Sequence, residues 1–273
     1  MQGDIATYFE AVFFFVYGSI LGSFFNVLIY RLPAKESIMF PASHCPKCGN
    51  TLSALENIPI LSWLFLRGKC SNCKSKISIQ YPLIELATAI LSLLSWYILF
   101  NPFFTPDRAF YLYIPELLQL LTILILIPIT IIDIRHFIIP DSITLGGLSL
   151  AILAAFIPEG ITPLSALIGI LAGGGTLYLI GIIGSFAMKK EAMGGGDIKL
   201  MAFVGALWGW EVASVAIMVA AFAGTIAGGV MMLLKKLDED HKIPFGPYLA
   251  FGIIIALFWG ESLLNWYLKF INY

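Results

Sequence analysis

The chain has 273 residues, of which 59% are hydrophobic and only 12% are charged, and its mean hydropathy is +0.89. This composition lies far from that of soluble proteins, and several apolar runs approach the length that spans the hydrocarbon core of a bilayer. The net charge is -1 and the basic residues gather in a few loops, which gives no indication of nucleic-acid binding. The sequence therefore predicts an all-α polytopic membrane protein that contacts lipid.

Eight apolar runs mark the expected transmembrane helices, at 7–29, 83–100, 114–132, 142–157, 163–187, 198–209, 212–234 and 248–268. The first run has acidic residues before it and Arg31 after it, opposite to the flanks of a cleavable signal peptide, so we expect it to be retained. The run 198–209 is short for a crossing at about 1.5 Å per residue, and it could form a re-entrant pair with its neighbour. About eight spans are predicted, and seven are the alternative.

The basic residues predict the orientation of these spans. If the amino terminus is outside, all but Arg108 and Lys269 of the 16 Lys and Arg residues lie in inside loops. Such an asymmetry satisfies the positive-inside tendency and places Asp133 and Asp197 together at the cytoplasmic face.

The inside loop from Arg31 to Pro82 is the one sizeable segment between spans, and it contains all four cysteines. They form two C-x2-C pairs, a spacing that lets two thiolates converge from each tight turn. Disulfides are the alternative, but a cytoplasmic loop is reducing. We therefore predict a zinc-ribbon-like loop in which a structural Zn²⁺ is held by Cys45, Cys48, Cys70 and Cys73. Four sulfur ligands leave no open position for a catalytic water.

Two acidic residues stand at the ends of apolar runs. Asp197 follows Gly194, Gly195 and Gly196, whose backbone can approach another chain closely. Considered by itself, Asp197 could be either a catalytic acid or the cap of the next helix. Asp133 ends an apolar run and has no helix start to cap, whereas Asp141 is placed to cap the helix that follows. Two such acids at one membrane face predict a catalytic dyad, Asp133 and Asp197, with the three glycines as backbone at the substrate site.

Taken together, these motifs resemble the bacterial type IV prepilin peptidases, which are membrane aspartyl proteases with a GxGD signature. The resemblance covers nearly the whole chain. The stretches that carry it are Gly22–Pro33, both cysteine pairs, Asn57–Pro59, Gly68–Cys70, Tyr81–Glu85, Asp133 with Ile139–Asp141, Glu191–Leu200 and Pro244–Pro247.

The resemblance implies two activities. Members of that family cut the leader from type IV prepilin or pseudopilin precursors at the cytoplasmic face of the bacterial inner membrane. The cysteine-bearing members also methylate the new amino terminus with S-adenosylmethionine. It further implies a first transmembrane helix at 1–30, a zinc-binding, methyltransferase-associated loop at 31–82, and a membrane-embedded peptidase domain at 83–273. That loop is too short for a βαβ nucleotide-binding fold, so the residues that bind the donor stay unassigned. Asn26 and Glu85 are polar residues near it whose expected roles are helix packing or capping.

Two other classes of function are alternatives to a peptidase. An ion-coupled transporter would use intramembrane acids as proton relays, but these acids lie at span ends rather than at the midplane. A membrane scaffold that docks partners through a zinc ribbon would leave the glycines before Asp197 without a role. A peptidase accounts both for the acids at the span ends and for the glycines before Asp197.

Overall fold

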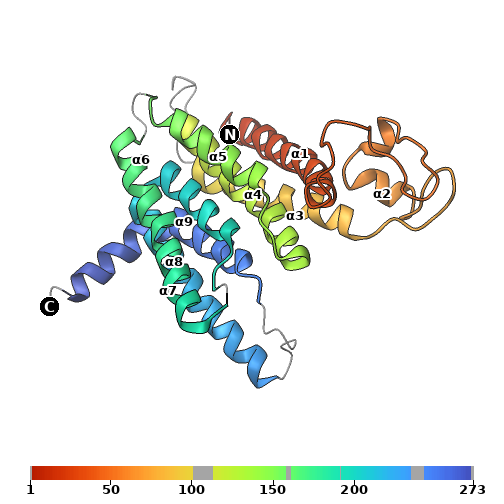
Figure 1. Ribbon diagram of the computed structural model, residues 1–273. Coiled ribbons are helices and arrows are strands. Elements are labelled where there is room, and N and C mark those ends of the chain that lie inside the picture. The colour runs from red at the N-terminus through yellow and green to blue at the C-terminus, as the bar shows by residue number, and fades with distance from the viewer. Residues whose placement is uncertain (1, 101–112, 158–160, 191, 235–242, 272–273) are drawn as a thin grey trace. The chain divides into compact units, whose positions relative to one another are not determined.

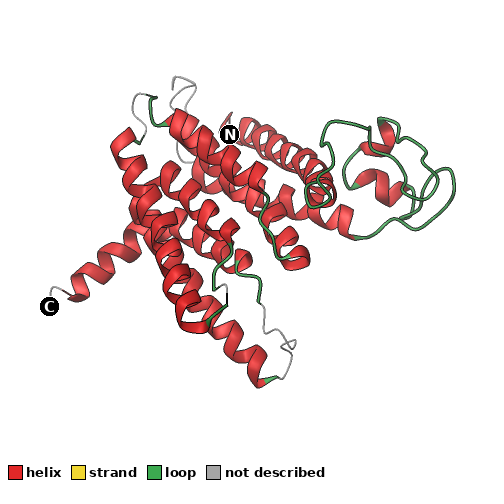
Figure 2. Ribbon diagram, in the orientation of Figure 1, coloured by secondary structure: helices red, strands yellow, loops and turns green. Residues whose placement is uncertain are grey.

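The computed structural model describes residues 2–100, 113–157, 161–190, 192–234 and 243–271 (Figure 1). Arg108 and Glu191, which entered the sequence predictions, lie outside these residues. Regular structure within the described ranges is helical, apart from two isolated β-bridges (Figure 2). The predicted all-α class is confirmed. The elements are α1 (Gln2–Arg31), η1 (Leu55–Asn57), α2 (Leu61–Phe65), α3 (Gln80–Ser95), η2 (Trp96–Phe100), α4 (Ile114–His136), α5 (Asp141–Ala154), α6 (Pro163–Ile170), η4 (Leu171–Gly175), α7 (Thr176–Met188), α8 (Gly195–Leu233) and α9 (Gly246–Ile271).

Six helical stretches among the described residues are long and apolar enough to cross a membrane, at Thr7–Arg31, Gln80–Phe100, Ile114–His136, Pro163–Ala187, Gly195–Leu233 and Gly246–Phe270. Each coincides with one or two of the expected spans. A seventh apolar helix, α5, has only 14 residues and falls below that length. The eight expected segments thus correspond to six long helices, the short α5, and a division inside α8.

The helix α8 is folded back on itself at Gly209. Its 39 residues would extend about 59 Å as a straight rod, about twice the hydrocarbon thickness. Gly209 has φ 86° and ψ 175°, which breaks the helix and suits glycine. A Cβ placed on Gly173 would contact both Met201 and Ala213, residues that a straight helix would hold about 18 Å apart. The segments 195–208 and 210–233 therefore form two arms of a helical hairpin.

The chain divides into two compact units, residues 1–128 and 129–273. In the first unit α1 packs along α3 through small residues. A Cβ on Gly18 would collide with Ser92 and Ala89, and one on Gly22 would collide with Glu85. Close backbone contact through glycine is typical of helices that pack in membranes, where van der Waals contact drives association.

The 31–82 loop belongs to the first unit and is tied to the ends of both helices. Arg31 donates to the carbonyl oxygens of Ser37 at 2.9 Å and Pro41 at 2.8 Å. Trp63 Nε1 donates to the Ile77 carbonyl at 3.3 Å. These bonds satisfy backbone groups in a segment that has little regular structure of its own.

In the second unit the hairpin α8 is the central element and contacts α5, α6, η4 and α9 (Figure 1). The helix α6 starts at Pro163 behind an N-cap at Thr162, whose side chain accepts a hydrogen bond from the Ser165 backbone at 3.2 Å. It crosses α8 where Gly169 meets Gly205. A Cβ on either glycine would overlap the carbonyl oxygen of the other, so only glycine fits at both positions.

We predict that Gly205→Ala lowers the free energy of unfolding by about 1–3 kcal/mol, because the added methyl group overpacks the contact of α6 with α8. Gly229→Ala on the same helix is the matched control, since nothing lies within 4 Å of its Cβ position. Thermal unfolding of both variants in detergent measures the difference. Equal stability of the two variants would show that α6 and α8 can move apart to admit the methyl group without a loss in the free energy of unfolding.

Candidate active site and metal centre

Asp133 lies in the last turn of α4 and is buried, with 5% of its surface exposed. Its Oδ2 accepts a hydrogen bond of 2.7 Å from the backbone N–H of Gly246. A buried carboxylate without such a donor would be strongly destabilising, so this bond reduces the free-energy cost of burying Asp133.

Gly246 begins α9 and must be a glycine. A Cβ at this position would lie 2.7 Å from Oδ2 and 3.0 Å from Cγ of Asp133. In the sequence, Pro244–Pro247 was only one of the stretches that carry the family resemblance, and the contact of Gly246 with Asp133 was missed. The available signal was Pro244-Phe-Gly-Pro247, in which a glycine between prolines indicates close backbone approach.

Asp197 lies in the first turn of α8, three residues after the N-cap Gly194, and is 8% exposed. Its carboxylate is hydrogen-bonded by the Gly194 backbone, which is how the third residue of a helix reaches back to the cap. Its Oδ1 is buried and has no hydrogen-bond partner among the described residues. Helix capping therefore accounts for one oxygen of Asp197 and leaves the other unexplained.

The two acids of the predicted dyad are brought together in the second unit. Asp133 and Asp197 lie close enough for their charges to interact. Gly196 packs against Ile139, because a Cβ there would lie 2.8 Å from the Ile139 side chain. This contact joins the turn after α4 to the start of α8, and hence the segments that carry the two acids.

The three glycines have different surroundings. Gly194 leaves room for the Asp197 carboxylate, since a Cβ would lie 2.7 Å from Oδ2. Gly196 leaves room for Ile139, whereas Gly195 has nothing within 4 Å of its Cβ position. Of the three, Gly195 is thus the one with open space beside it, as far as the described residues show.

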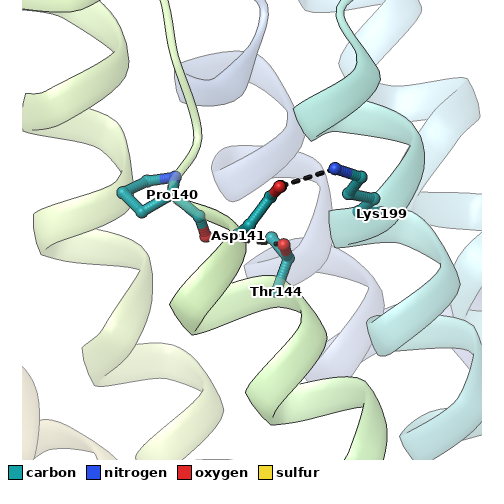
Figure 3. A network of polar contacts seen from close by, with 4 residues as sticks. All are labelled: Pro140, Asp141, Thr144 and Lys199. Carbon is teal, nitrogen blue, oxygen red and sulfur yellow. Dashed lines mark hydrogen bonds and ion pairs between the residues drawn. The ribbon is translucent and has the colours of Figure 1, made fainter. Parts of the chain in front are cut away.

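Asp141 is the first residue of α5, and the prediction that it caps this helix is wrong. The N-cap is Pro140, and the start of α5 has no side-chain cap. The carboxylate instead forms an ion pair with Lys199, with Oδ1 and Nζ 2.6 Å apart, and Figure 3 shows the two side chains pointing toward each other across α5 and α8. Both are substantially exposed, so the pair contributes about 0–1 kcal/mol.

An apolar groove of about 340 Å³ lies beside these segments in the second unit. Met193, which precedes the glycines, and Phe245, which precedes Gly246, both line it. The other lining residues are Leu177, Ile180, Ile217, Ala221, Gly224, Thr225, Ile243 and Tyr248. The groove therefore adjoins the chain segments that hold both acids.

The four cysteines of the first unit converge on one point. Their sulfur atoms lie within 4.8 Å of one another, with 3.8 Å between Cys45 and Cys73 and 4.0 Å between Cys48 and Cys70. Tetrahedral zinc with Zn–S bonds of about 2.3 Å places its sulfurs about 3.8 Å apart. A disulfide needs about 2.05 Å, and all four cysteines are free. The arrangement fits a four-sulfur metal site and not two disulfides.

The two cysteine turns share one backbone design. Cys45 N–H donates to Asn50 and Cys70 N–H donates to Ser75, both at 2.9 Å. The fourth residue after each first cysteine has a positive φ, 70° at Gly49 and 57° at Lys74. Each turn also ends in one of the two isolated β-bridges. Each half of the site is thus a preformed turn.

The environment favours the thiolate, the form that binds metal, at Cys45 and Cys73, whereas burial and hydrogen bonds with the other three cysteines raise the pKa of Cys48 to about 11. Hydrogen bonds from the backbone of Cys48 and Lys47 and from the Ser75 side chain lower the pKa of Cys45 to about 6. Hydrogen bonds from Ser75 also lower the pKa of Cys73.

Asn26 joins α1 to α3, as the helix-packing interpretation expects, whereas Glu85 holds the loop against α3. Glu85 Oε2 accepts a hydrogen bond of 2.6 Å from the Ile60 backbone. Asn26 Nδ2 donates to the carbonyl oxygens of Gly22 and Tyr81, each at 3.2 Å.

Comparison with known proteins assigns both units. Residues 16–99 match the Bacterial Peptidase A24 N-terminal domain, and residues 120–229 match the Type IV leader peptidase family. The chain is 36% identical to the Prepilin leader peptidase/N-methyltransferase of Aeromonas salmonicida, covering 96% of this chain and 94% of the relative. The proteins of the same name from Pseudomonas aeruginosa and Legionella pneumophila are each 34% identical, over 94% and 92% of this chain and 92% and 91% of theirs. No solved structure matches.

A paired carboxylate site in one unit, a four-cysteine centre in the other and relatives of this identity along almost the whole length lead to one assignment. The chain belongs to the type IV leader peptidase family.

Proposed function

We propose that this protein cleaves the leader peptide of type IV prepilin-like precursors with Asp133 and Asp197, and methylates the new amino terminus. The observation that carries the peptidase proposal is the pair of buried, interacting carboxyl groups, of which one oxygen, Asp197 Oδ1, has no partner in the part of the chain that the structure describes. A buried polar atom without a partner is rare in native proteins, and catalytic sites are one of the few places where it occurs. The names of the relatives supply the substrate class.

Two carboxyl groups hydrolyse a peptide bond when one is ionised and the other protonated. The ionised group takes a proton from water as the water oxygen attacks the carbonyl carbon. The protonated group donates to the carbonyl oxygen. The C–N bond then breaks and its nitrogen receives a proton, so no serine or cysteine nucleophile is needed. The Gly246 N–H fixes Asp133 for this task, and the Gly194 backbone fixes Asp197.

The backbone beside the acids suits an extended substrate. Gly195 has nothing within 4 Å of its Cβ position, so a peptide can approach it closely. The groove of about 340 Å³ that begins at Met193 and Phe245 offers an apolar surface for substrate side chains next to the scissile bond.

The predicted orientation places this chemistry at the cytoplasmic face of the bacterial inner membrane. The support is the excess of Lys and Arg in the loops assigned to the inside. The last turn of α4 and the first turns of α8 both carry basic residues, Arg135 and Lys199. Ion-coupled transport has no support among the relatives, and both acids lie in terminal turns of helices.

For methylation, the proposed assignments are Zn²⁺ at the four cysteines, S-adenosylmethionine as the methyl donor, a methyltransferase-associated loop at 31–82 and a peptidase domain at 83–273. The donor supplies a methyl group on a sulfonium sulfur, which the new terminal amine accepts as it loses a proton. Zinc holds the loop in shape, because a segment this short has no hydrophobic core of its own.

The direct test incubates the purified protein in detergent with a leader-bearing prepilin peptide and identifies the products by mass spectrometry. Cleavage at the leader boundary, with methylation when S-adenosylmethionine is added, is the expected result. An intact peptide after prolonged incubation with folded protein would overturn the proposal.

The dyad predicts that Asp133→Asn and Asp197→Asn each lower kcat/KM for leader cleavage at least about a thousandfold, because each removes one member of the acid pair. Both proteins should remain folded and inserted in the membrane. Asp141→Asn is the matched control, since it alters only an exposed ion pair and should keep most of the activity. Near-normal cleavage by either dyad variant, or a dead Asp141 variant, would reassign the acids.

Gly246→Ala should lower cleavage about a hundredfold while leaving the protein folded, because the added methyl group displaces Asp133, and a shift of about 1 Å in a catalytic group has this effect. The comparison is with Gly229→Ala, which adds the same group in open space. Steady-state cleavage rates of the two variants decide the point. If both cleave like the wild type, Asp133 does not depend on α9 for its position.

Elemental analysis should find one zinc per chain, because the four sulfurs have tetrahedral spacing. Replacing Cys45 and Cys48 by serine should remove the metal and reduce methylation more than cleavage. Lys47→Ala changes the same turn without removing a ligand and should keep the metal. Metal-free protein after purification without chelators would contradict the prediction.

A further inference from the structure

The first unit contains a cavity of about 540 Å³ that the peptidase site does not use. It lies between the end of α1, the start of α3 and the inner side of the cysteine loop, all within residues 23–85. Its volume is within the range of about 300–1,000 Å³ that is typical of small-molecule sites. It therefore has room for a ligand of nucleoside size.

The floor of this cavity carries an unsatisfied polar atom. Asn26 is 2% exposed and its Oδ1 has no hydrogen-bond partner among the described residues. Its orientation is fixed, because Nδ2 already donates to the Gly22 and Tyr81 carbonyls. The remaining oxygen is an acceptor on a residue that lines the cavity, and a ligand with an N–H or O–H donor can satisfy it.

The charged residues on the walls include three carboxylates, Glu36, Glu56 and Glu85. Glu56 accepts a hydrogen bond from the Ser53 backbone at 2.8 Å, and hydrogen bonds from Ser71 and Ser53 lower its pKa, which keeps it ionised. Glu85 is fixed by the Ile60 backbone. These groups suit a ligand that is positively charged or presents hydroxyl groups.

Trp63 supplies a rigid aromatic wall. Its indole nitrogen is anchored to the Ile77 carbonyl, so the ring is held in place beside the cavity. An aromatic face can stack on a nucleobase or attract a cation such as a sulfonium. Arg31, Lys47 and Lys76 also line the cavity and can pair with a carboxylate.

We propose that this cavity binds the methyl donor, a sulfonium-bearing adenosyl amino acid, with the Asn26 Oδ1 as an acceptor, Glu56 as a counter-charge and Trp63 as a stacking wall. The ligand complements the lining: it offers N–H and O–H donors to Asn26 Oδ1, positive charges to the carboxylates, a carboxylate to the basic residues and an adenine ring to Trp63. The inference rests on the methyltransferase part of the proposed function. It also explains how a loop without a βαβ unit can serve a methyltransferase, since two membrane helices complete the site.

The test is equilibrium binding of radiolabelled S-adenosylmethionine to the full-length, zinc-loaded protein in detergent, without prepilin, so that no methyl transfer occurs. Wild-type protein should bind one donor per chain, and S-adenosylhomocysteine should displace it. Asn26→Ala should weaken binding about tenfold, the effect of one buried hydrogen bond. Ser19→Ala is the control on the same helix, because its hydroxyl bonds only the Val16 carbonyl and does not line the cavity.

Glu56→Gln provides a second variant that is independent of the packing at Asn26, since glutamine can still accept from Ser53. It should weaken binding by a similar factor. Ultraviolet cross-linking of the donor should label peptides within 23–85. Unchanged affinity in both variants, absence of saturable binding to the wild type, or labelling confined to 129–273 would each overturn the proposal.

Leader cleavage is measured on the same preparations, which separates this inference from the peptidase proposal. Asn26→Ala and Glu56→Gln should cleave at the wild-type rate, and Asp197→Asn should bind the donor normally. A wild-type protein that cleaves but does not bind overturns only the donor site. One that binds but does not cleave overturns only the dyad.

Discussion

The hydrogen bond from the Gly246 backbone to Asp133 joins residues that are 113 positions apart in the chain. Burying a carboxyl group at the end of an apolar helix is costly, and a backbone donor offsets that cost without a counter-ion that would compete for substrate. The donor can approach only because residue 246 has no side chain. The start of α9 is therefore fixed to the end of α4. Since α9 also packs against α8, the same contact constrains the helix that carries Asp197.

The two units stabilise their polar groups, within a largely apolar protein, in different ways. In the second unit, helix ends and glycines bring backbone N–H groups to the two acids. In the first unit, a loop that could not bury a core is held by four sulfurs, by two preformed turns, by hydrogen bonds that Asn26 and Arg31 donate and by one that Glu85 accepts. Because each unit contains its own polar centre, loss of one reaction need not abolish the other.

Much of this arrangement follows from patterns that are local in the sequence. Apolar runs predict the helices, the C-x2-C spacing predicts the convergence of the four cysteines, and a glycine run before an acid predicts the start of α8. The break at Gly209 falls at the end of the expected span 198–209. The features that could not be predicted depend on which helices pack against one another. The partner of Asp141 is Lys199, 58 residues away, and a local cap was the reasonable expectation. The roles of Gly246 and of the oxygen on Asn26 likewise depend on packing between distant segments, which periodicity does not encode.

The short helices next to the acids affect the surrounding lipid. The helix α5 and the arm 195–208 each have 14 residues, so each rises about 21 Å, whereas the hydrocarbon layer is about 30 Å thick. The two pack together, with Gly147 against Phe203, and their starts are joined by the contact of Gly196 with Ile139. Such a pair either thins the bilayer around it or leaves one end below the surface. Local thinning would bring bulk water within reach of Asp133 and Asp197, and under the proposed mechanism this would deliver the hydrolytic reactant to carboxyl groups that the rest of the fold buries.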